Sequence, residues 1–243
     1  LVAAVLVGIT GDMDMKIMVQ QQPMKVAAAE ALYTTTQSAP FSILSVGNVE
    51  GTHANTVLDV PGLLSWLATG STDGTVQGID NLQQQYVQQY GPGNYMPYVP
   101  VTYWGFRLMI GLGMIAALYA LWALWRYRGR RLPKANRLFT WASAGIVLFP
   151  LIGIQMGWIF TEMGRQPWVV FGQLKTVDGG SPLLSPFDAW VSIIGFTLLY
   201  AVLAVIEVTL LLKYIRAGAP EVVNEDPHAD AEADRDKQLY FAY

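Results

Sequence analysis

Residues 101–125 read VTYWGFRLMIGLGMIAALYALWALW, a 25-residue apolar run in which Arg107 is the single charged side chain. As a helix at 1.5 Å per residue this run would be about 37 Å long, more than the roughly 30 Å of a bilayer hydrocarbon core. Residues 138–160 and 189–212 form two further runs of spanning length. The composition agrees, because 53% of the residues are hydrophobic, 14% are charged and the mean hydropathy is +0.33. The sequence therefore predicts an all-α membrane protein, folded as a transmembrane helical bundle.

Residues 1–11 are also apolar, but they are too few to cross a bilayer. The chain opens on Leu1, without the basic segment or the small-residue cleavage site of a signal peptide. We interpret residues 1–11 as the end of a truncated transmembrane helix, so that the chain would be the carboxyl-terminal part of a larger polytopic protein. This gives one partial and three full spans.

The charge distribution predicts the orientation. The connection 126–137 holds six basic residues and no acidic one, which is typical of a cytoplasmic loop rather than of a nucleic-acid site. Alternation of the three helices in residues 101–216 then puts the segment 12–100 outside and the carboxyl terminus inside. Residues 217–243 are rich in acidic side chains and predict a flexible cytoplasmic tail.

The long outer segment, residues 12–100, is polar. Pro23 suits a first helical turn, and residues 25–32 are strong helix formers. The remainder, including the glutamines at 83–85, reads as loop that could hold one short amphipathic piece. A connection of this length is usually functional or partly disordered.

The residue types that are missing narrow the chemistry. The chain has no cysteine, so it offers no disulfide, thiolate ligand or iron–sulfur site. Its two histidines are His53 in the outer segment and His228 in the tail. Neither lies in a predicted span, so this chain supplies no buried histidine ligand.

The stretch 158–168, WIFTEMGRQPW, is the first candidate site. Glu162 follows Trp158 by four residues, so both project from one helix face, and the following glycine and proline end that helix. An unpaired carboxylate in this apolar setting is costly, which makes Glu162 a functional candidate. Arg165 and Trp168, taken alone, are explained equally well as interfacial anchors.

The second candidate is the stretch 103–113, YWGFRLMIGLG. Arg107 lies inside the apolar run and needs an anionic partner. Met109 is either core filler or, through its thioether, an axial haem ligand. Gly111 and Gly113 leave a flat surface that suits helix packing or a planar cofactor. Since residues two apart on a helix point in different directions, Arg107 and Met109 would serve different atoms.

The third candidate is the outer stretch 20–30, QQQPMKVAAAE, which carries Lys25 and Glu30. Its simplest interpretation is a solvated helix. Glu207 in the last predicted span is a lone carboxylate that fits helix packing, snorkelling or a proton route, and we assign it no site.

Together these stretches resemble subunit I of the cytochrome bd-type quinol oxidases. The resemblance rests on three patterns in the family's order: Gln-Pro-x-Lys-x-Ala-Ala-x-Glu at 22–30, Phe-Arg-x-Met-x-Gly-x-Gly at 106–113 and Glu-x-Gly-Arg-Gln-Pro-Trp at 162–168. It covers nearly the whole chain. Residues 12–100 then correspond to the quinol-binding Q-loop of the family, at the short end of its range.

The resemblance implies roles for the haem-site residues. Met109 would be the axial ligand of the low-spin haem b, with Arg107 near it to stabilise the reduced form or pair with propionates. Glu162 would be the axial ligand of the high-spin haem b, and Trp158 would lie between haems. Arg165 would be structural or pair with a propionate.

The resemblance also implies the reaction. Lys25 and Glu30 would bind or deprotonate quinol at the outer face, and electrons would pass through the low-spin haem to the high-spin haem b and haem d, where oxygen becomes water without proton pumping. The partners would be the amino-terminal half of subunit I, which holds the family's histidine ligands, subunit II, small accessory subunits and membrane lipid. The location would be the bacterial inner membrane, and no nucleic acid would bind.

The main alternative is a secondary transporter or channel subunit, in which Glu162 and Arg165 bind an ion or a substrate. That class favours inverted repeats and broken helices at mid-membrane depth, whereas the sequence shows no repeat and its charges cluster toward the outer face. A non-catalytic membrane anchor would leave Arg107 and Glu162 without a purpose.

Overall fold

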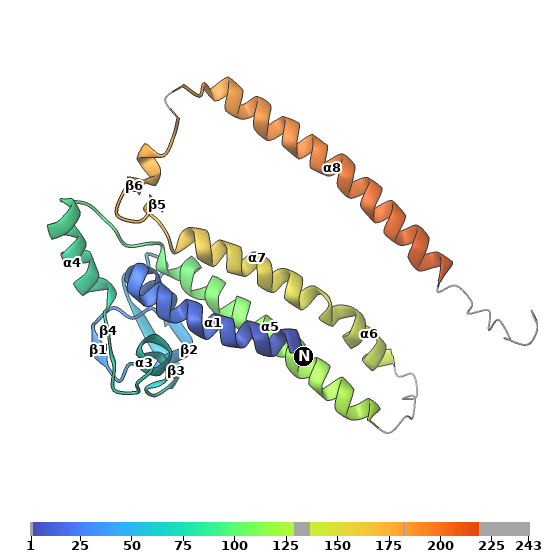
Figure 1. Cartoon of the computed structure of the whole chain (residues 1–243), viewed down its shortest axis with the longest axis horizontal. Helices are drawn as coiled ribbons and strands as arrows, with labels where there is room; N and C mark the ends of the chain where they lie inside the picture. Colours follow the sequence, from blue (N-terminus) through green and yellow to red (C-terminus); the bar gives the residue numbers. More distant parts are fainter. Residues whose placement is uncertain (1, 129–136, 182, 219–243) are drawn as a thin grey trace, which may run out of the picture. The chain divides into compact units, whose positions relative to one another are not determined.

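The computed structural model describes residues 2–128, 137–181 and 183–218. Three of its helical segments are long and apolar enough to cross a membrane, namely Val99–Arg126, Phe139–Met163 and Pro186–Ala217, which confirms the predicted fold class (Figure 1). The chain divides into two compact units, Leu1–Gly180 and Ser181–Tyr243. The predicted cytoplasmic loop and tail lie largely outside the described residues, at 129–136 and 219–243.

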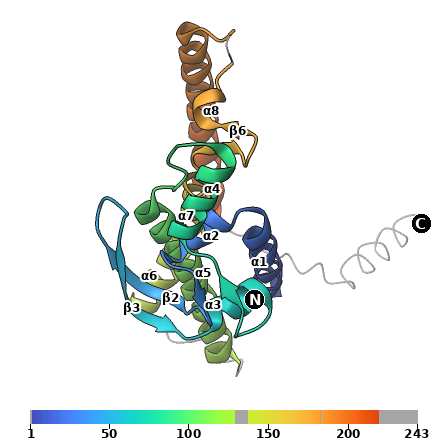
Figure 2. The same cartoon turned by 90° about the vertical axis from the view of Figure 1, so that its left-hand side faces the viewer.

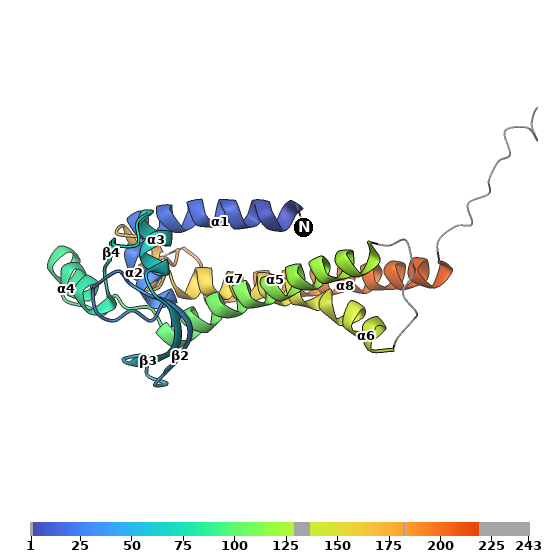
Figure 3. The same ribbon diagram turned by 90° about the horizontal axis from the view of Figure 1, so that it is seen from below.

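In the first unit, α5 (Val99–Tyr127) and α7 (Leu148–Met163) lie side by side (Figures 1 and 3). Their backbones approach closely at Gly105, where an added β-carbon would stand 3.2 Å from the carbonyl oxygen of Met156 and 3.2 Å from the amide nitrogen of Phe160. A small residue at this point permits that approach, as in many membrane helix pairs. The close packing of the two helices therefore fixes the relative positions of the motifs they carry.

The second predicted span is not a single helix. It consists of α6 (Arg137–Ile146) and α7, separated by a turn at Val147. Pro150 explains the break, because it lacks an N–H group and its ring opposes the carbonyl four residues earlier, on Ile146. A hydropathy profile alone does not predict this break in the helix.

The first helix is longer than predicted. The α1 helix runs from Val2 to Gln21, so the predicted boundary between a truncated span and an outer loop falls inside it. The polar continuation stays helical partly because Lys16 pairs with Asp12 one turn earlier, at 2.6 Å. The charged residues of this second half explain why the hydropathy pattern stops near residue 11.

The segment between α1 and α5, residues 22–98, folds into a layer that we call the outer layer. The short α2 helix (Pro23–Ala29) lies at its centre, in contact with α1, α4 (Ile79–Tyr90) and α5. Pro23 occupies its first turn, as the sequence indicates, but the helix ends at Ala29, with Glu30 as its cap, rather than at residue 32. Residues 24–29 are all buried. Its alanines leave room for the neighbouring helices to approach closely, so α2 is a core element and not the solvated helix that the sequence suggests.

The remaining outer segment is folded, and its interpretation as loop is wrong. It forms two antiparallel strand pairs and two helices: β1 (Thr36–Gln37) with β4 (Thr75–Val76), β2 (Phe41–Gly47) with β3 (Ala54–Val60), α3 (Leu63–Thr69) and α4 (Ile79–Tyr90). Figure 2 shows the β2–β3 hairpin on one side of this layer and α4 on another. The amphipathic piece around the glutamines at 83–85 is α4. Asn48 supports the hairpin turn by accepting the amide hydrogens of Thr52 and His53, each at 3.0 Å.

After α7 the chain forms a small ribbon, β5 (Trp168–Val170) with β6 (Leu174–Lys175), and a short 3₁₀ turn, η1 (Thr176–Asp178). Trp168 is buried in an aromatic cluster, stacked on Tyr95 at 5.7 Å between ring centroids and edge-on to Tyr90 at 5.0 Å. Trp168 is therefore not an interfacial anchor. It joins the end of α7 to the outer layer.

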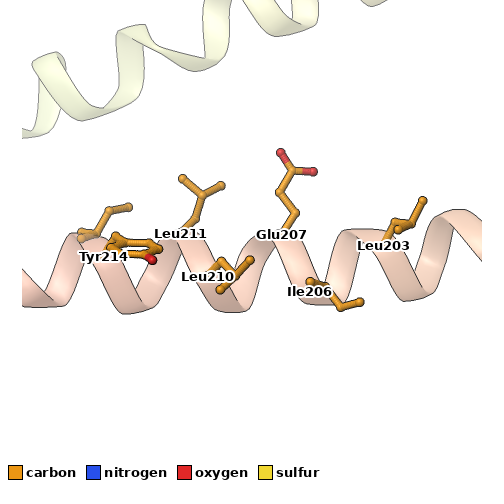
Figure 4. Close-up of a pocket in the computed structure, with 7 residues that line it drawn as sticks. Leu203, Ile206, Glu207, Leu210, Leu211 and Tyr214 are labelled. Atoms are coloured by element: carbon orange, nitrogen blue, oxygen red, sulfur yellow. The ribbon is translucent and has the colours of Figure 1, made fainter.

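The second unit contains α8 (Pro186–Ala217). A capping box begins this helix, in which the Ser185 hydroxyl accepts the Asp188 amide hydrogen and the Asp188 carboxylate accepts the Ser185 amide hydrogen. Glu207 projects from the helix between apolar side chains (Figure 4). Leu203, Leu210 and Leu211 flank it on the same shallow groove of α8, which no other charged residue lines. These surroundings assign no functional site to Glu207.

Candidate redox site

The three sequence motifs meet at the junction of α2, α5 and α7. The closest link is a buried ion pair: Arg107 Nη2 of α5 donates to Glu30 Oε2, at the end of α2, over 2.5 Å. The two side chains are 7% and 1% exposed. The anionic partner that Arg107 requires is thus the carboxylate that ends the 22–30 motif, 77 residues earlier in the chain.

Aromatic rings surround the Arg107 guanidinium. Its central carbon lies 4.4 Å from the ring centre of Phe41, 4.9 Å from that of Tyr103 and 5.2 Å from that of Phe106. Such contacts favour a planar cation that has lost its water. Two of its nitrogens, Nε and Nη1, are buried and have no hydrogen-bond partner among the described residues. Arg107 therefore has donors to spare for a further anionic group.

Glu30 is poised to change its protonation state. Burial raises its pKa to about 7, against the opposing effects of the Arg107 charge and hydrogen bond and of the Ser42 amide. The Ser42 amide hydrogen is donated to Oε2 at 3.1 Å, while Oε1 is buried without a partner among the described residues. A carboxyl group with a pKa near neutrality and one free oxygen suits a general base.

Lys25, five residues before Glu30, turns toward α7. Its ammonium lies 4.9 Å from the ring centre of Phe160, and its stem crosses Gly164, where an added β-carbon would stand 2.9 Å from Lys25 Cγ. Burial and, secondly, the charge of Arg165 lower the pKa of Lys25, whereas Glu162 acts in the opposite direction. Lys25 therefore faces the end of α7, near Glu162 and Arg165, whereas Glu30 faces Arg107 of α5.

Met109 lies in the interface between α5 and α7. An added β-carbon on Gly157 would stand 2.8 Å from the Met109 sulfur, so the thioether rests directly on this glycine of α7. Met109 and Arg107 serve different neighbours, which agrees with their spacing. On the same helix, β-carbons on Gly111 and Gly113 would meet nothing within 4 Å, so this stretch of α5 presents open surface.

Glu162 lies in the last turn of α7, where it contacts Arg165. The guanidinium of Arg165 donates to Glu162 Oε1 at 2.7 Å, and the two side chains are 31% and 54% exposed. Trp158, one turn earlier on the same helix, is 62% exposed. In this chain the Trp158 and Glu162 face is thus uncovered, while Gly164 closes the helix as the sequence predicts.

Several residues of this site had no role predicted from the sequence. Tyr103 contacts the Arg107 guanidinium and reaches the β2–β3 hairpin with its hydroxyl group. Its position four residues before Arg107, on the same face of α5, is the one signal that could have revealed it. Phe41 and Ser42 come from a segment that reads as loop, so nothing local indicates their role. His53 lies in the exposed connection of the β2–β3 hairpin.

Fold and site define a helical membrane protein in which Glu30 of an extramembrane layer forms a buried ion pair with Arg107 of a spanning helix. Within that class, the chain belongs to the cytochrome bd terminal oxidase subunit I family, whose sequence model matches residues 1–219. The membrane location follows from this family and from the spanning helices. The alternative of a transporter or channel subunit finds no support.

The chain is similar to curated members of the family. Cytochrome bd ubiquinol oxidase subunit 1 of Bacillus subtilis (strain 168) is 33% identical over 231 residues, which is 95% of this chain and 48% of the relative. Cytochrome bd-II ubiquinol oxidase subunit 1 of Escherichia coli (strain K12) is 27% identical over 275 residues, or 89% of this chain and 53% of the relative.

A solved structure is also similar. The bd oxidase from Geobacillus thermodenitrificans matches with a TM-score of 0.68 and 26% identity, covering 89% of this chain and 47% of that one. The chain thus spans about half the length of the relatives it matches.

Proposed function

We propose that this chain forms the quinol-oxidising part of a bd-type terminal oxidase, which oxidises membrane quinol and reduces oxygen to water. The observation that carries the proposal is the buried pair of Glu30 and Arg107, because it joins the Q-loop motif to the helix of the Met109 motif. The remaining length of subunit I, subunit II and small accessory subunits would complete the enzyme. The outer layer would face outward from a bacterial cell membrane, with the carboxyl terminus in the cytoplasm.

The residues on α5 fit a haem. Met109 offers a thioether, Arg107 has two buried donors without partners among the described residues, and the surface at Gly111 and Gly113 is open in the part of the chain that the structure describes. A thioether is a known axial ligand of low-spin haem, and guanidinium pairs well with a carboxylate such as a propionate. Met109 would hold a low-spin haem b here. When bound, the haems supply one-electron transfer from quinol and the reduction of oxygen.

Lys25 and Glu30 would act on the quinol. A quinol hydroxyl must lose its proton when the ring is oxidised, and the Glu30 carboxylate is a base of suitable pKa. The Lys25 ammonium, whose pKa burial lowers, would hold the substrate oxygen by donating a hydrogen bond. Arg107 keeps the Glu30 carboxylate oriented through Oε2, which leaves Oε1 to receive the proton.

Glu162 would be the iron ligand of a second, high-spin haem b, with Trp158 one turn away on the same face. Their exposure in this chain supports a role toward a group that the rest of the enzyme covers. Arg165 pairs with Glu162 and would orient it or meet a propionate. Haem d would complete the oxygen-reducing pair.

A reduced-minus-oxidised optical spectrum of the purified complete oxidase tests this proposal. We expect haem b and haem d bands, and we expect Met109→Leu to remove the low-spin b component from a folded complex. Absence of haem bands would end the oxidase interpretation. An unchanged low-spin signal in Met109→Leu would sink the ligand assignment alone.

A further inference from the structure

Tyr103 of α5 contacts Arg107 with its ring and the β2 strand with its hydroxyl group. Its ring centre lies 4.9 Å from the central carbon of the Arg107 guanidinium. Its hydroxyl accepts the amide hydrogen of Ser45 at 2.6 Å and lies 2.9 Å from Ser42 Oγ, where either oxygen can donate. Tyr103 is 3% exposed, so these contacts are made in the protein interior, away from bulk water.

The β2 strand in turn contacts Glu30. The Ser42 amide hydrogen is donated to Glu30 Oε2 at 3.1 Å, and the same oxygen accepts from Arg107 Nη2. The last torsion of a glutamate side chain is soft and nearly two-fold, so a single donor leaves the two oxygens free to exchange places. Two donors from different elements fix which oxygen is bound. Oε1, which has no partner among the described residues, therefore stays free to receive a proton.

A bulge in β2 makes this arrangement possible. The register shifts between Ser42 and Leu44 and again between Leu44 and Ser45, so both serines are buried, although residues three apart on a regular strand would face opposite sides. Ser42 gives its amide hydrogen to Glu30, and Ser45 gives its own to Tyr103. Bulges that re-aim groups are frequent beside functional sites. The Tyr103 hydroxyl thus holds the bulge in the shape that points the Ser42 amide at Glu30.

The hairpin has other anchors, but they lie at its turn. The Tyr98 hydroxyl donates to Val49 O at 2.7 Å, and the Tyr33 hydroxyl donates to Gly51 O at 2.9 Å. Val49 and Gly51 belong to the connection between β2 and β3. These two tyrosines hold the end of the hairpin, whereas Tyr103 holds its bulge.

Few charged groups act on Glu30 in the described part of the chain. Burial raises its pKa to about 7, while the Arg107 charge and hydrogen bond from α5 and the Ser42 amide from β2 lower it. Neither Tyr103 nor a charged side chain of α1 or α4, the other helices against α2, is among these causes. Lys25 of α2 faces Phe160 on α7. Loss of the Ser42 amide bond would therefore raise the pKa of Glu30.

We propose that Tyr103 is a positioning residue for quinol oxidation, which holds the β2 bulge so that the Ser42 amide and Arg107 together fix Glu30 Oε2. The inference deepens the proposed function and rests on it, because Glu30 has to be the base that receives the quinol proton. Tyr103 touches neither the quinol nor a haem and transfers no proton. It acts through Ser42 and Arg107.

The test is the pH dependence of quinol oxidation by the complete oxidase, with a short-chain quinol as substrate. Tyr103→Phe removes the hydroxyl and keeps the ring beside Arg107. Two or three amide hydrogen bonds can lower the pKa of a carboxylate by about 2 units, so loss of one should shift the base-active limb upward by about 1 pH unit. Below that limb the rate should fall by up to about tenfold, and above it the variant should approach the parental rate. A merely structural role would lower the rate at every pH.

Tyr98→Phe is the matched control, because it removes a tyrosine hydroxyl from the turn of the same hairpin. Its pH profile should match that of the parent. An equal shift in Tyr98→Phe would mean that any loosening of the hairpin affects Glu30, which overturns the specific role of Tyr103. An unshifted limb in Tyr103→Phe, with or without a lower rate, overturns it as well.

An infrared titration gives a second readout that does not depend on turnover. The band of the protonated Glu30 carboxyl group, assigned by its loss in Glu30→Gln, should titrate about 1 pH unit higher in Tyr103→Phe, and an unchanged midpoint contradicts the proposal. Chemically reduced haem spectra report an intact fold in each variant.

Glu30→Gln also separates the two levels of the argument. If it keeps the parental rate of haem reduction by quinol, the proposed quinol site itself is wrong. If it slows that reduction while Tyr103→Phe keeps the parental pH profile, the quinol site stands and only the positioning role of Tyr103 is refuted.

Discussion

The substitution Gly157→Ala tests whether α7 holds the Met109 thioether in place for iron. A β-carbon at this position would stand 2.8 Å from the Met109 sulfur and 3.4 Å from its Cγ. Non-bonded heavy atoms need roughly 3.5–4.0 Å, so the sulfur must retreat by about 1 Å. Gly157 has no direct bond to a cofactor in the proposal. Its replacement therefore acts only through the position of Met109.

The expected effect is a weakened axial bond. Residues that orient a metal ligand typically contribute about 10- to 100-fold in metal affinity, or about 1.4–2.7 kcal/mol. Reduced-minus-oxidised optical spectra and electron paramagnetic resonance of the complete oxidase would measure it, as a conversion of low-spin to high-spin signal. Gly153→Ala is the matched control one turn away, because its β-carbon would meet Met109 O at 3.6 Å and Leu112 Cβ at 3.7 Å, which are ordinary contacts.

Either of two results would refute this reasoning. If Gly157→Ala retains the full low-spin spectrum while Met109→Leu loses it, the sulfur is a ligand but α7 does not set its position. If both variants retain the spectrum, Met109 is not the ligand.

Three further predictions follow from the same contacts. The Arg107 charge lowers the pKa of Glu30, so Arg107→Leu should raise that pKa and shift the base-active limb of the quinol-oxidation pH profile upward by about 1–3 pH units. An unshifted limb would show that Glu30 is not the titrating base. Gly105→Ala should destabilise the complex by about 1–3 kcal/mol in thermal inactivation, because its β-carbon would meet the α7 backbone at 3.2 Å, whereas Gly145→Ala, whose β-carbon would meet no described atom within 4 Å, should not. Glu162→Ala should abolish oxygen uptake yet preserve the low-spin band, and persisting uptake with normal haem content would remove Glu162 from the site.

The spanning helices were predictable because hydropathy is a local property. The apolar run containing Arg107 appears as α5 with nearly the predicted bounds. The break in the second span could also have been predicted, because Pro150 lies four residues after Ile146 and its ring opposes the Ile146 carbonyl. Its signal is a single residue inside an apolar run, which a window of hydropathy averages away.

The outer layer was not predictable in the same way. Its main strands mix polar and apolar residues on both faces, and the bulged β2 strand lacks the alternation that identifies a strand. Burial of α2 depends on neighbours far along the chain. The same holds for the site: Glu30 and Arg107 were both identified as candidates, but only the folded chain assigns them to each other.

The central claim is that Glu30, held by Arg107, takes the proton of the quinol. Its most direct test is the rate at which a short-chain quinol reduces the low-spin haem in the Glu30→Gln variant of the complete oxidase, at neutral pH. The account predicts a rate lowered by about 100-fold with the same haem spectrum after chemical reduction. Reduction by quinol at the parental rate would contradict it.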